Sequence, residues 1–213
     1  MLVPESLKEC TRKVLEGEYD IPELKLEAPV ILDIGANVGA FAVWAKSRWP
    51  GATIHCYEPN EKSFDLLERN ADFAVLHNVA VWSHSGTKFL FNGYSNPGEA
   101  SLFHDWRNQD EGSEVICISA DLLPPADVLK IDTEGAESII LKGYKYIDGV
   151  QAVMLEWHSL YDRYHLGSML MDHGFGCVSD AAWAIDCGVM KMARLRDYKQ
   201  SLYYSNAGVA RVG

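Results

Sequence analysis

The sequence has few basic residues for its length and no long apolar run. Its 213 residues include 30 Asp and Glu but only 19 Lys and Arg, which gives a formal net charge of −11. Nucleic-acid binding requires a basic surface, so we expect no nucleic-acid partner and favour a small, neutral or cationic one. No stretch reaches the length of a transmembrane helix, so we also expect no membrane partner.

Cysteine is sparse as well, and its count of five is odd. The cysteines are scattered along the chain at Cys10, Cys56, Cys117, Cys177 and Cys187. Cys56 and Cys117 lie in apolar, strand-like runs, where cysteine behaves as a small hydrophobic residue. This usage favours a reducing compartment without a disulfide framework. Pro4, Glu5 and Lys8 stand where a signal peptide would need apolar residues, so we expect a cytoplasmic protein.

The remaining composition is that of an ordinary globular protein, with 48% hydrophobic and 23% charged residues. We see no internal repeat and no interior linker. We therefore expect one domain over residues 29–213, preceded by a helical extension over residues 1–28. Residues 92–113 are rich in Gly, Asn and Ser, and a loop of this length in a compact domain is typically a lid or a binding loop.

Apolar runs alternate with helical patterns through much of the chain. The expected strands cover residues 29–34, 53–57, 73–82, 86–91, 114–119, 127–132, 150–157, 175–185 and 188–195. The expected helices cover residues 4–17, 38–48, the stretch capped by Asn60, the short segment that ends near Lys142, and residues 160–172. Strands and helices in this order predict an α/β fold with a doubly wound, mostly parallel sheet, closed by an antiparallel pair.

The most informative stretch covers residues 30–39. It opens as a buried strand, breaks at Gly35 and leads through Asn37 into a helix. Gly35 lets the backbone turn and approach a ligand closely, and Asn37 is expected to cap the helix. Glu58, at the end of the next strand, follows Gly39 by 19 positions, the spacing at which an acid meets a ribose. Strand, turn, helix and acid together indicate a nucleotide site.

Two nucleotide ligands compete for this site. A nicotinamide dinucleotide requires a second glycine where Asn37 stands. Asp33 would repel a pyrophosphate, whereas it would attract the ammonium group of a nucleoside that carries an amino acid. We therefore expect S-adenosylmethionine as the cofactor. An NAD(P)-dependent oxidoreductase and a non-catalytic nucleoside-binding module on the same fold are the alternatives.

Ionisable residues gather at the ends of the fourth and fifth core strands. Lys130, Asp132 and Glu134 follow the period of a strand face, as do Glu156 and His158. These strands should be neighbours, so we expect Asp132, Glu134, Glu156 and His158 to converge as catalytic candidates. Two interpretations remain open: Asp132, Glu156 and His158 bind a divalent metal such as Mg²⁺, or His158 is a general base oriented by a carboxylate. The alternative to a functional site is that Lys130 forms an ion pair that only stabilises the fold.

Several of these segments resemble the FkbM family of S-adenosylmethionine-dependent methyltransferases. The segments are residues 32–39 (LDIGANVG), 57–60 (YEPN), 78–81 (NVAV) and 129–137 (LKIDTEGAE). Glu156 and His158 are similar to a further acid–histidine pair of that family. The resemblance covers about residues 29–158, and the fourth segment is its most specific part.

This resemblance implies a class I methyltransferase fold, which is a Rossmann-like, mostly parallel seven-stranded sheet with an antiparallel closing strand. It also implies contacts of Asp33 and Gly35 with the methionine end of the cofactor, of Glu58 with the ribose, and of residues 78–80 with the adenine. The expected cofactor residues are Asp33, Gly35, Ala36, Asn37, Gly39, Glu58, Pro59, Asn78, Val79, Ala80 and Asp132. Family members mostly methylate oxygen on sugars or natural products, so we expect O-methylation of a small-molecule acceptor that residues 92–113 would help to bind.

Overall fold

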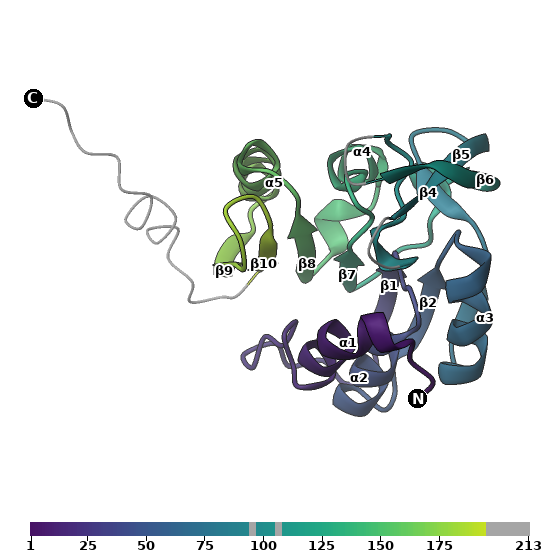
Figure 1. The fold of residues 1–213 in the computed structure, drawn as a ribbon. Coiled ribbons are helices and arrows are strands. Elements are labelled where there is room, and N and C mark those ends of the chain that lie inside the picture. The colour runs from purple at the N-terminus through teal and green to yellow at the C-terminus, as the bar shows by residue number, and fades with distance from the viewer. Residues whose placement is uncertain (94–96, 105–107, 195–213) are drawn as a thin grey trace, which may run out of the picture.

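The computed structural model describes residues 1–93, 97–104 and 108–194, and its centre is a seven-stranded sheet (Figure 1). The strands are β1 (Val30–Ile34), β2 (Thr53–Tyr57), β3 (Val75–His77), β7 (Val128–Ile131), β8 (Ala152–Trp157), β9 (Gly176–Ala182) and β10 (Gly188–Ala193). They lie in the order β3-β2-β1-β7-β8-β10-β9, and β10 is antiparallel to both of its neighbours. The expected fold class is confirmed.

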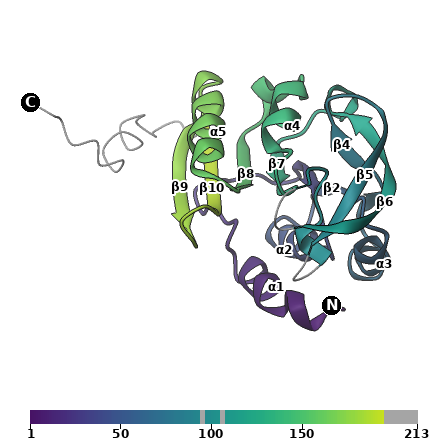
Figure 2. The ribbon, with the colours of Figure 1, turned by 45° about the horizontal axis from the view of Figure 1, so that its top comes forward.

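Helices cover both faces of this sheet, as Figures 1 and 2 show. The helices are α1 (Lys8–Leu15), α2 (Ala40–Arg48), α3 (Glu61–Asn70), α4 (Glu137–Gly143) and α5 (Leu160–Asp172), with short 3-10 turns at Glu5–Leu7, Pro97–Glu99, Ala120–Leu122 and Ile147–Gly149. Within β1, Ile31 packs in the core under α2 and α3, and Leu32 packs in the core under α4 and α5. Both faces are buried, which explains why the core strands are continuous apolar runs. Among the described residues, every helix is too short or too polar to span a membrane.

A second, three-stranded sheet lies beside the carboxyl ends of β1 and β2. It consists of β4 (Ala80–Trp82), β5 (Gly86–Gly93) and β6 (Asn108–Ser119), in the order β4-β6-β5. The prediction of one interrupted strand over residues 73–82 is therefore wrong. The chain leaves the main sheet after His77, where the Asn78 amide donates to the Glu58 carbonyl oxygen at 2.9 Å, and β4 pairs with β6 instead.

The loop expected over residues 92–113 is shorter than the pattern indicated. Its first residues belong to β5 and its last ones to β6, while residues 94–96 and 105–107 lie outside the described residues. Gly112 misled the prediction because glycine usually marks a loop. In β6 it permits close strand pairing, since a Cβ at Gly112 would lie 2.0 Å from the Leu90 carbonyl oxygen. Residues 195–213, at the end of the expected domain, are also outside the described residues.

The N-terminal extension packs on the same face of the sheet as α2. Tyr19 is buried, and its ring meets the ring of Phe41 edge-on at a centroid distance of 5.5 Å. The Lys191 ammonium, on β10, donates to the carbonyl oxygens of Glu18 at 3.1 Å and Asp20 at 2.9 Å. The extension is therefore bound to the last strand of the fold.

Candidate active site

A pocket of about 600 Å³, measured with its open mouth, lies between the carboxyl ends of the main strands and the second sheet. Its walls are formed by Gly35, Asn37, Glu58, Pro59, Val79, Ala80, Val81, Leu90, Gly98, Ala100, Leu102, Asp132, Thr133, Glu134 and Ala136. Most of the expected cofactor residues are in this set. Asp33, Ala36, Gly39 and Asn78 are not: the first three are buried, whereas Asn78 is exposed.

The turn after β1 presses against the end of β7. Gly35 has a φ of 76°, and a Cβ there would lie 1.7 Å from the Asp132 carbonyl oxygen, so only glycine fits. Asn37 also has a positive φ, 49°. The prediction that Asn37 caps α2 is wrong, because Asn37 belongs to the turn and Gly39 occupies the N-cap position without a side-chain hydrogen bond.

The N–H groups of this turn are already used within the protein. Those of Gly35 and Ala36 donate to the Tyr57 carbonyl oxygen at 2.9 and 3.0 Å. That of Asn37 donates to Glu58 Oε2 at 2.8 Å. A pyrophosphate site needs such N–H groups to face the ligand. The turn is therefore unsuited to a dinucleotide, as the sequence indicated through Asp33 and the missing glycine.

Glu58 is the acid at the end of β2. Its Oε1 accepts from the Asn60 N–H and its Oε2 from the Asn37 N–H, both at 2.8 Å. Burial raises its pKa to about 7, although both N–H groups act in the opposite direction. Each oxygen keeps a lone pair for a hydroxyl donor, which suits a ribose. Asn60 caps α3 as predicted, accepting from the N–H groups of Lys62 and Ser63.

Asn37 provides a second polar contact for a ligand in this pocket. The Asn37 Oδ1 atom is buried, and it has no hydrogen-bond partner within the described part of the chain. An unpaired acceptor of this kind suits a donor such as an ammonium or hydroxyl group of a ligand. Together with Glu58 it provides polar contacts at two points of the pocket wall.

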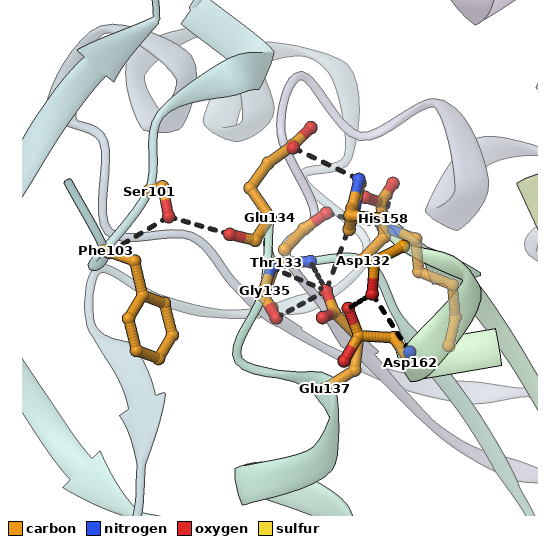
Figure 3. A network of polar contacts seen from close by, with 12 residues as sticks. Ser101, Phe103, Asp132, Thr133, Glu134, Gly135, Glu137, His158 and Asp162 are labelled. Atoms are coloured by element: carbon orange, nitrogen blue, oxygen red, sulfur yellow. Dashed lines mark hydrogen bonds and ion pairs between the residues drawn. The ribbon is translucent and has the colours of Figure 1, made fainter. Parts of the chain in front are cut away.

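A cluster of acids and a histidine lies at the opposite wall (Figure 3). One ligating atom from each of Asp132, Glu134 and His158 lies within 4.8 Å of the others. His158 Nδ1 is 3.3 Å from Glu134 Oε2. Asp132 and Glu134 line the pocket, while the His158 side chain lies behind them and is only 5% exposed. The structure thus brings together three of the four expected catalytic residues.

Glu156, the fourth, lies in β8 and is not part of that group of three. Burial and the charges of Asp132 and Glu134 raise its pKa well above the ordinary value of a carboxyl group. Where the sequence suggested Asp132, Glu156 and His158 as metal ligands, the geometry groups Glu134 with Asp132 and His158.

Glu137 is a residue of the site that the sequence reasoning did not select. It is 1% exposed, and its Oε1 accepts from the Thr133 N–H at 2.8 Å, the Thr133 hydroxyl at 3.0 Å and the Gly135 N–H at 3.3 Å. It therefore holds the loop that carries Glu134. An acid at the first position of a helix was the available signal, because such acids bind free N–H groups.

Residues 98–104 form another wall of the pocket. The Ser101 hydroxyl donates to the Glu134 carbonyl oxygen at 2.7 Å and accepts from the Phe103 N–H at 3.1 Å (Figure 3). The Phe103 ring packs on the ring of Trp82. The described part of the expected loop is thus attached both to the acid-bearing loop and to the second sheet.

Comparison with known proteins decides the family. Residues 33–175 match the model of the methyltransferase FkbM domain. The chain belongs to the FkbM methyltransferase family. Methyltransferase sdnD of Sordaria araneosa is 29% identical, over 84% of this chain and 86% of its own. Hexuronic acid methyltransferase AglP of Haloferax volcanii is 30% identical, over 79% of this chain and 74% of its own.

A solved structure supports the same fold. The crystal structure of a methyltransferase FkbM from Methylobacillus flagellatus superposes with a TM-score of 0.61 at 13% identity, over 84% of this chain and 47% of that one. This FkbM methyltransferase is therefore an S-adenosylmethionine-dependent enzyme. The predicted family, cofactor and enzyme class are confirmed, and the oxidoreductase and the non-catalytic module are set aside.

Proposed function

We propose that the enzyme methylates an oxygen of a small hydroxylated acceptor, and that Asp132, Glu134 and His158 activate that oxygen. The observation that carries the proposal is the position of this cluster in and behind the wall of the cofactor pocket. The relative AglP is named for methylation of a hexuronic acid, which supports a sugar-like acceptor. The net charge of −11 supports an acceptor that is not a polyanion.

The cofactor contacts follow from the geometry of the pocket. We propose that Glu58 accepts from the ribose hydroxyls, that Asn37 Oδ1 and the turn at Gly35 contact the methionine end, and that residues 78–80 flank the adenine. Asp33, 0% exposed, acts on the methionine end through its charge and through the turn that it supports. These contacts position the donor, and positioning is the largest contribution expected in a displacement at a methyl group.

Bound S-adenosylmethionine supplies an activated methyl group. As the acceptor oxygen forms its new bond to carbon, its hydroxyl proton must leave. We propose that this proton passes to His158 through Glu134. The Glu134 carboxylate lines the pocket and takes the proton from the hydroxyl, and His158 Nδ1, 3.3 Å from Glu134 Oε2, receives it as an imidazolium that the regenerated carboxylate stabilises. Residues 98–104 close the pocket over the reacting groups, the role expected of a lid.

A divalent cation is the second candidate for activating the acceptor. It is favoured by the donor set, because two carboxylates and an imidazole within 4.8 Å of one another suit Mg²⁺ or Mn²⁺. In that case the cluster would hold the cation, and the cation rather than His158 would polarise the hydroxyl.

An acceptor screen tests the proposal, with mass spectrometry detecting transfer of one methyl group. His158→Gln and Asp132→Asn should each lower turnover by about 10²-fold or more. His158→Gln should retain binding of S-adenosylhomocysteine, measured by calorimetry. His84→Gln is the matched control, because His84 is exposed and hydrogen-bonds Ser83 away from the pocket. Full activity in both variants would contradict the proposal.

The same assay distinguishes proton removal by His158 from activation of the acceptor by a divalent cation. Activity that EDTA abolishes and Mg²⁺ restores would assign the cluster to a cation. Activity that EDTA leaves unchanged in metal-free buffer would assign proton removal to His158.

A further inference from the structure

Lys130 is a buried cation in the middle of the main sheet. It lies in β7, opposite Asp33 of β1 and Met154 of β8, and is 4% exposed. Burying an ammonium group in a central strand is costly unless its donors are satisfied. The contacts of the Lys130 ammonium must therefore explain why a lysine is buried at this position.

Those partners come from both sides of the active site. The Lys130 ammonium donates to the Gly35 carbonyl oxygen of the cofactor turn. It lies 3.2 Å from Asp33 Oδ1 and 3.5 Å from Asp132 Oδ2. The ammonium therefore has one hydrogen bond to the backbone and two carboxylates as ion-pair partners. Lys130 thus connects the cofactor turn directly to an acid of the proton-accepting cluster.

A structural counter-ion for Asp33 would not need the other two contacts. Asp33 is 0% exposed and does not line the pocket, whereas Asp132 does. The ion pair of the ammonium with Asp132 Oδ2 therefore reaches a carboxylate that lines the pocket. The turn itself has other restraints, since Gly35 and Ala36 both donate to the Tyr57 carbonyl oxygen.

We propose that Lys130 is a positioning residue for methyl transfer. Its ammonium fixes the orientation of the Asp132 carboxylate relative to the cofactor turn, so that the acceptor-activating cluster and the methyl donor are held at the required separation. The inference rests on the proposed role of Asp132 in acceptor activation.

The test must avoid leaving Asp33 as an unpaired buried charge, because Lys130→Met alone could unfold the protein for that reason. We therefore take Asp33→Asn as the reference and compare it with Asp33→Asn/Lys130→Met, which has neither charge. Thermal unfolding and calorimetry with S-adenosylhomocysteine establish that both proteins are folded and bind the product. We expect their dissociation constants to agree within about threefold, since the turn keeps its bonds to Tyr57.

Steady-state kinetics gives the decisive readout. Adding Lys130→Met to Asp33→Asn should lower kcat by about 10- to 100-fold with little change in the KM for S-adenosylmethionine. Adding it to Asp33→Asn/Asp132→Asn should lower kcat by less than about threefold, because the residue on which Lys130 acts is already altered. This split between kcat and KM, together with the dependence on Asp132, is not expected of a residue that only supports the fold.

Equal kcat values for Asp33→Asn and Asp33→Asn/Lys130→Met would overturn the inference, and so would an equal loss in both backgrounds. Failure of the proposed function is a different result, since Asp132→Asn alone would then retain full activity.

Discussion

The two halves of the active site satisfy their polar groups in opposite ways. The cofactor half, which consists of the turn after β1 and Glu58, pairs a single carboxylate with neutral backbone donors. The acid half, which consists of Asp132, Glu134, Glu156 and His158, places carboxyl groups close to one another, and burial together with the charges of Asp132 and Glu134 raises the pKa of Glu156. The cofactor half keeps free acceptor capacity for hydroxyl or ammonium donors of a ligand, at Asn37 Oδ1 and Glu58, whereas the acid half favours binding of a proton or a cation.

Gly35→Ala has the largest effect that we expect, and it tests whether the two halves are joined through backbone contact. The new Cβ would lie 1.7 Å from the Asp132 carbonyl oxygen, and the φ of 76° is unfavourable for alanine. We expect a loss of about 4 kcal/mol or more in the free energy of unfolding and no binding of S-adenosylhomocysteine. Chemical denaturation and calorimetry measure both.

Gly149→Ala is the control for that variant, because a Cβ at Gly149 meets no atom within 4 Å. It should change stability by less than about 0.5 kcal/mol. Normal cofactor binding by Gly35→Ala would show that the halves are independent.

Glu137→Ala tests the acid half alone. It removes the acceptor shared by Thr133 and Gly135, so two buried N–H groups and a hydroxyl lose a partner. We expect a loss of about 2 to 3 kcal/mol in stability and a decrease in kcat of about 10²-fold, with cofactor affinity nearly unchanged. Glu61→Ala is the control, since Glu61 occupies the same helix position in α3 but is exposed. A kcat equal to that of the control would show that the Thr133–Gly135 loop needs no carboxylate.

Glu58→Gln tests whether the Glu58 carboxyl group makes ligand binding by the cofactor half depend on pH. The pKa of about 7 lies above the unfolded value, so the protonated carboxyl stabilises the free protein below pH 7, and this stability is lost as pH rises. Ligand binding has the opposite dependence, because ribose hydroxyls require the ionised carboxylate as acceptor. We expect the dissociation constant of S-adenosylhomocysteine to fall about tenfold from pH 6 to pH 8. Glu58→Gln should show no such trend, and the same slope in both proteins would assign it to another group.

Ser101→Ala has the smallest expected effect and concerns residues 98–104, the pocket wall that is bonded to the loop of Glu134. It removes the bond from the Ser101 hydroxyl to the Glu134 carbonyl oxygen. Loss of one such bond costs about 1 kcal/mol, so the KM for S-adenosylmethionine should rise about two- to fivefold. Ser119→Ala removes a similar bond to the Ser83 carbonyl oxygen, away from the pocket, and should leave KM unchanged. An unchanged KM in both would show that residues 98–104 do not restrain the cofactor.

The comparison also explains which features could be predicted from sequence. The features that could be predicted act near their own position in the chain: Gly35 forms a turn, and Asn60 caps the helix that follows it. The helix expected over residues 160–172 matches α5 for the same reason, since its pattern is local. Such signals follow from backbone geometry and periodicity alone.

Contacts between distant segments could not be predicted in this way. Whether Glu134 or Glu156 joins His158 depends on the positive φ of Glu134, 55°, which follows from the packing of its loop. The transfer of residues 80–82 to a second sheet depends on pairing with β6, more than 30 positions later. Asn37 looked like a cap because the sequence shows a good capping residue but not the left-handed turn that it occupies.

The bonds of Lys191 have a consequence for the order of assembly during synthesis. The carbonyl groups of Glu18 and Asp20 leave the ribosome well before their partner, because the ammonium that binds them lies 173 and 171 positions later. The N-terminal extension can contact α2 early, yet it cannot be fastened to β10 until almost the whole described chain has emerged. This segment is therefore made long before the contact with β10 that holds it in place.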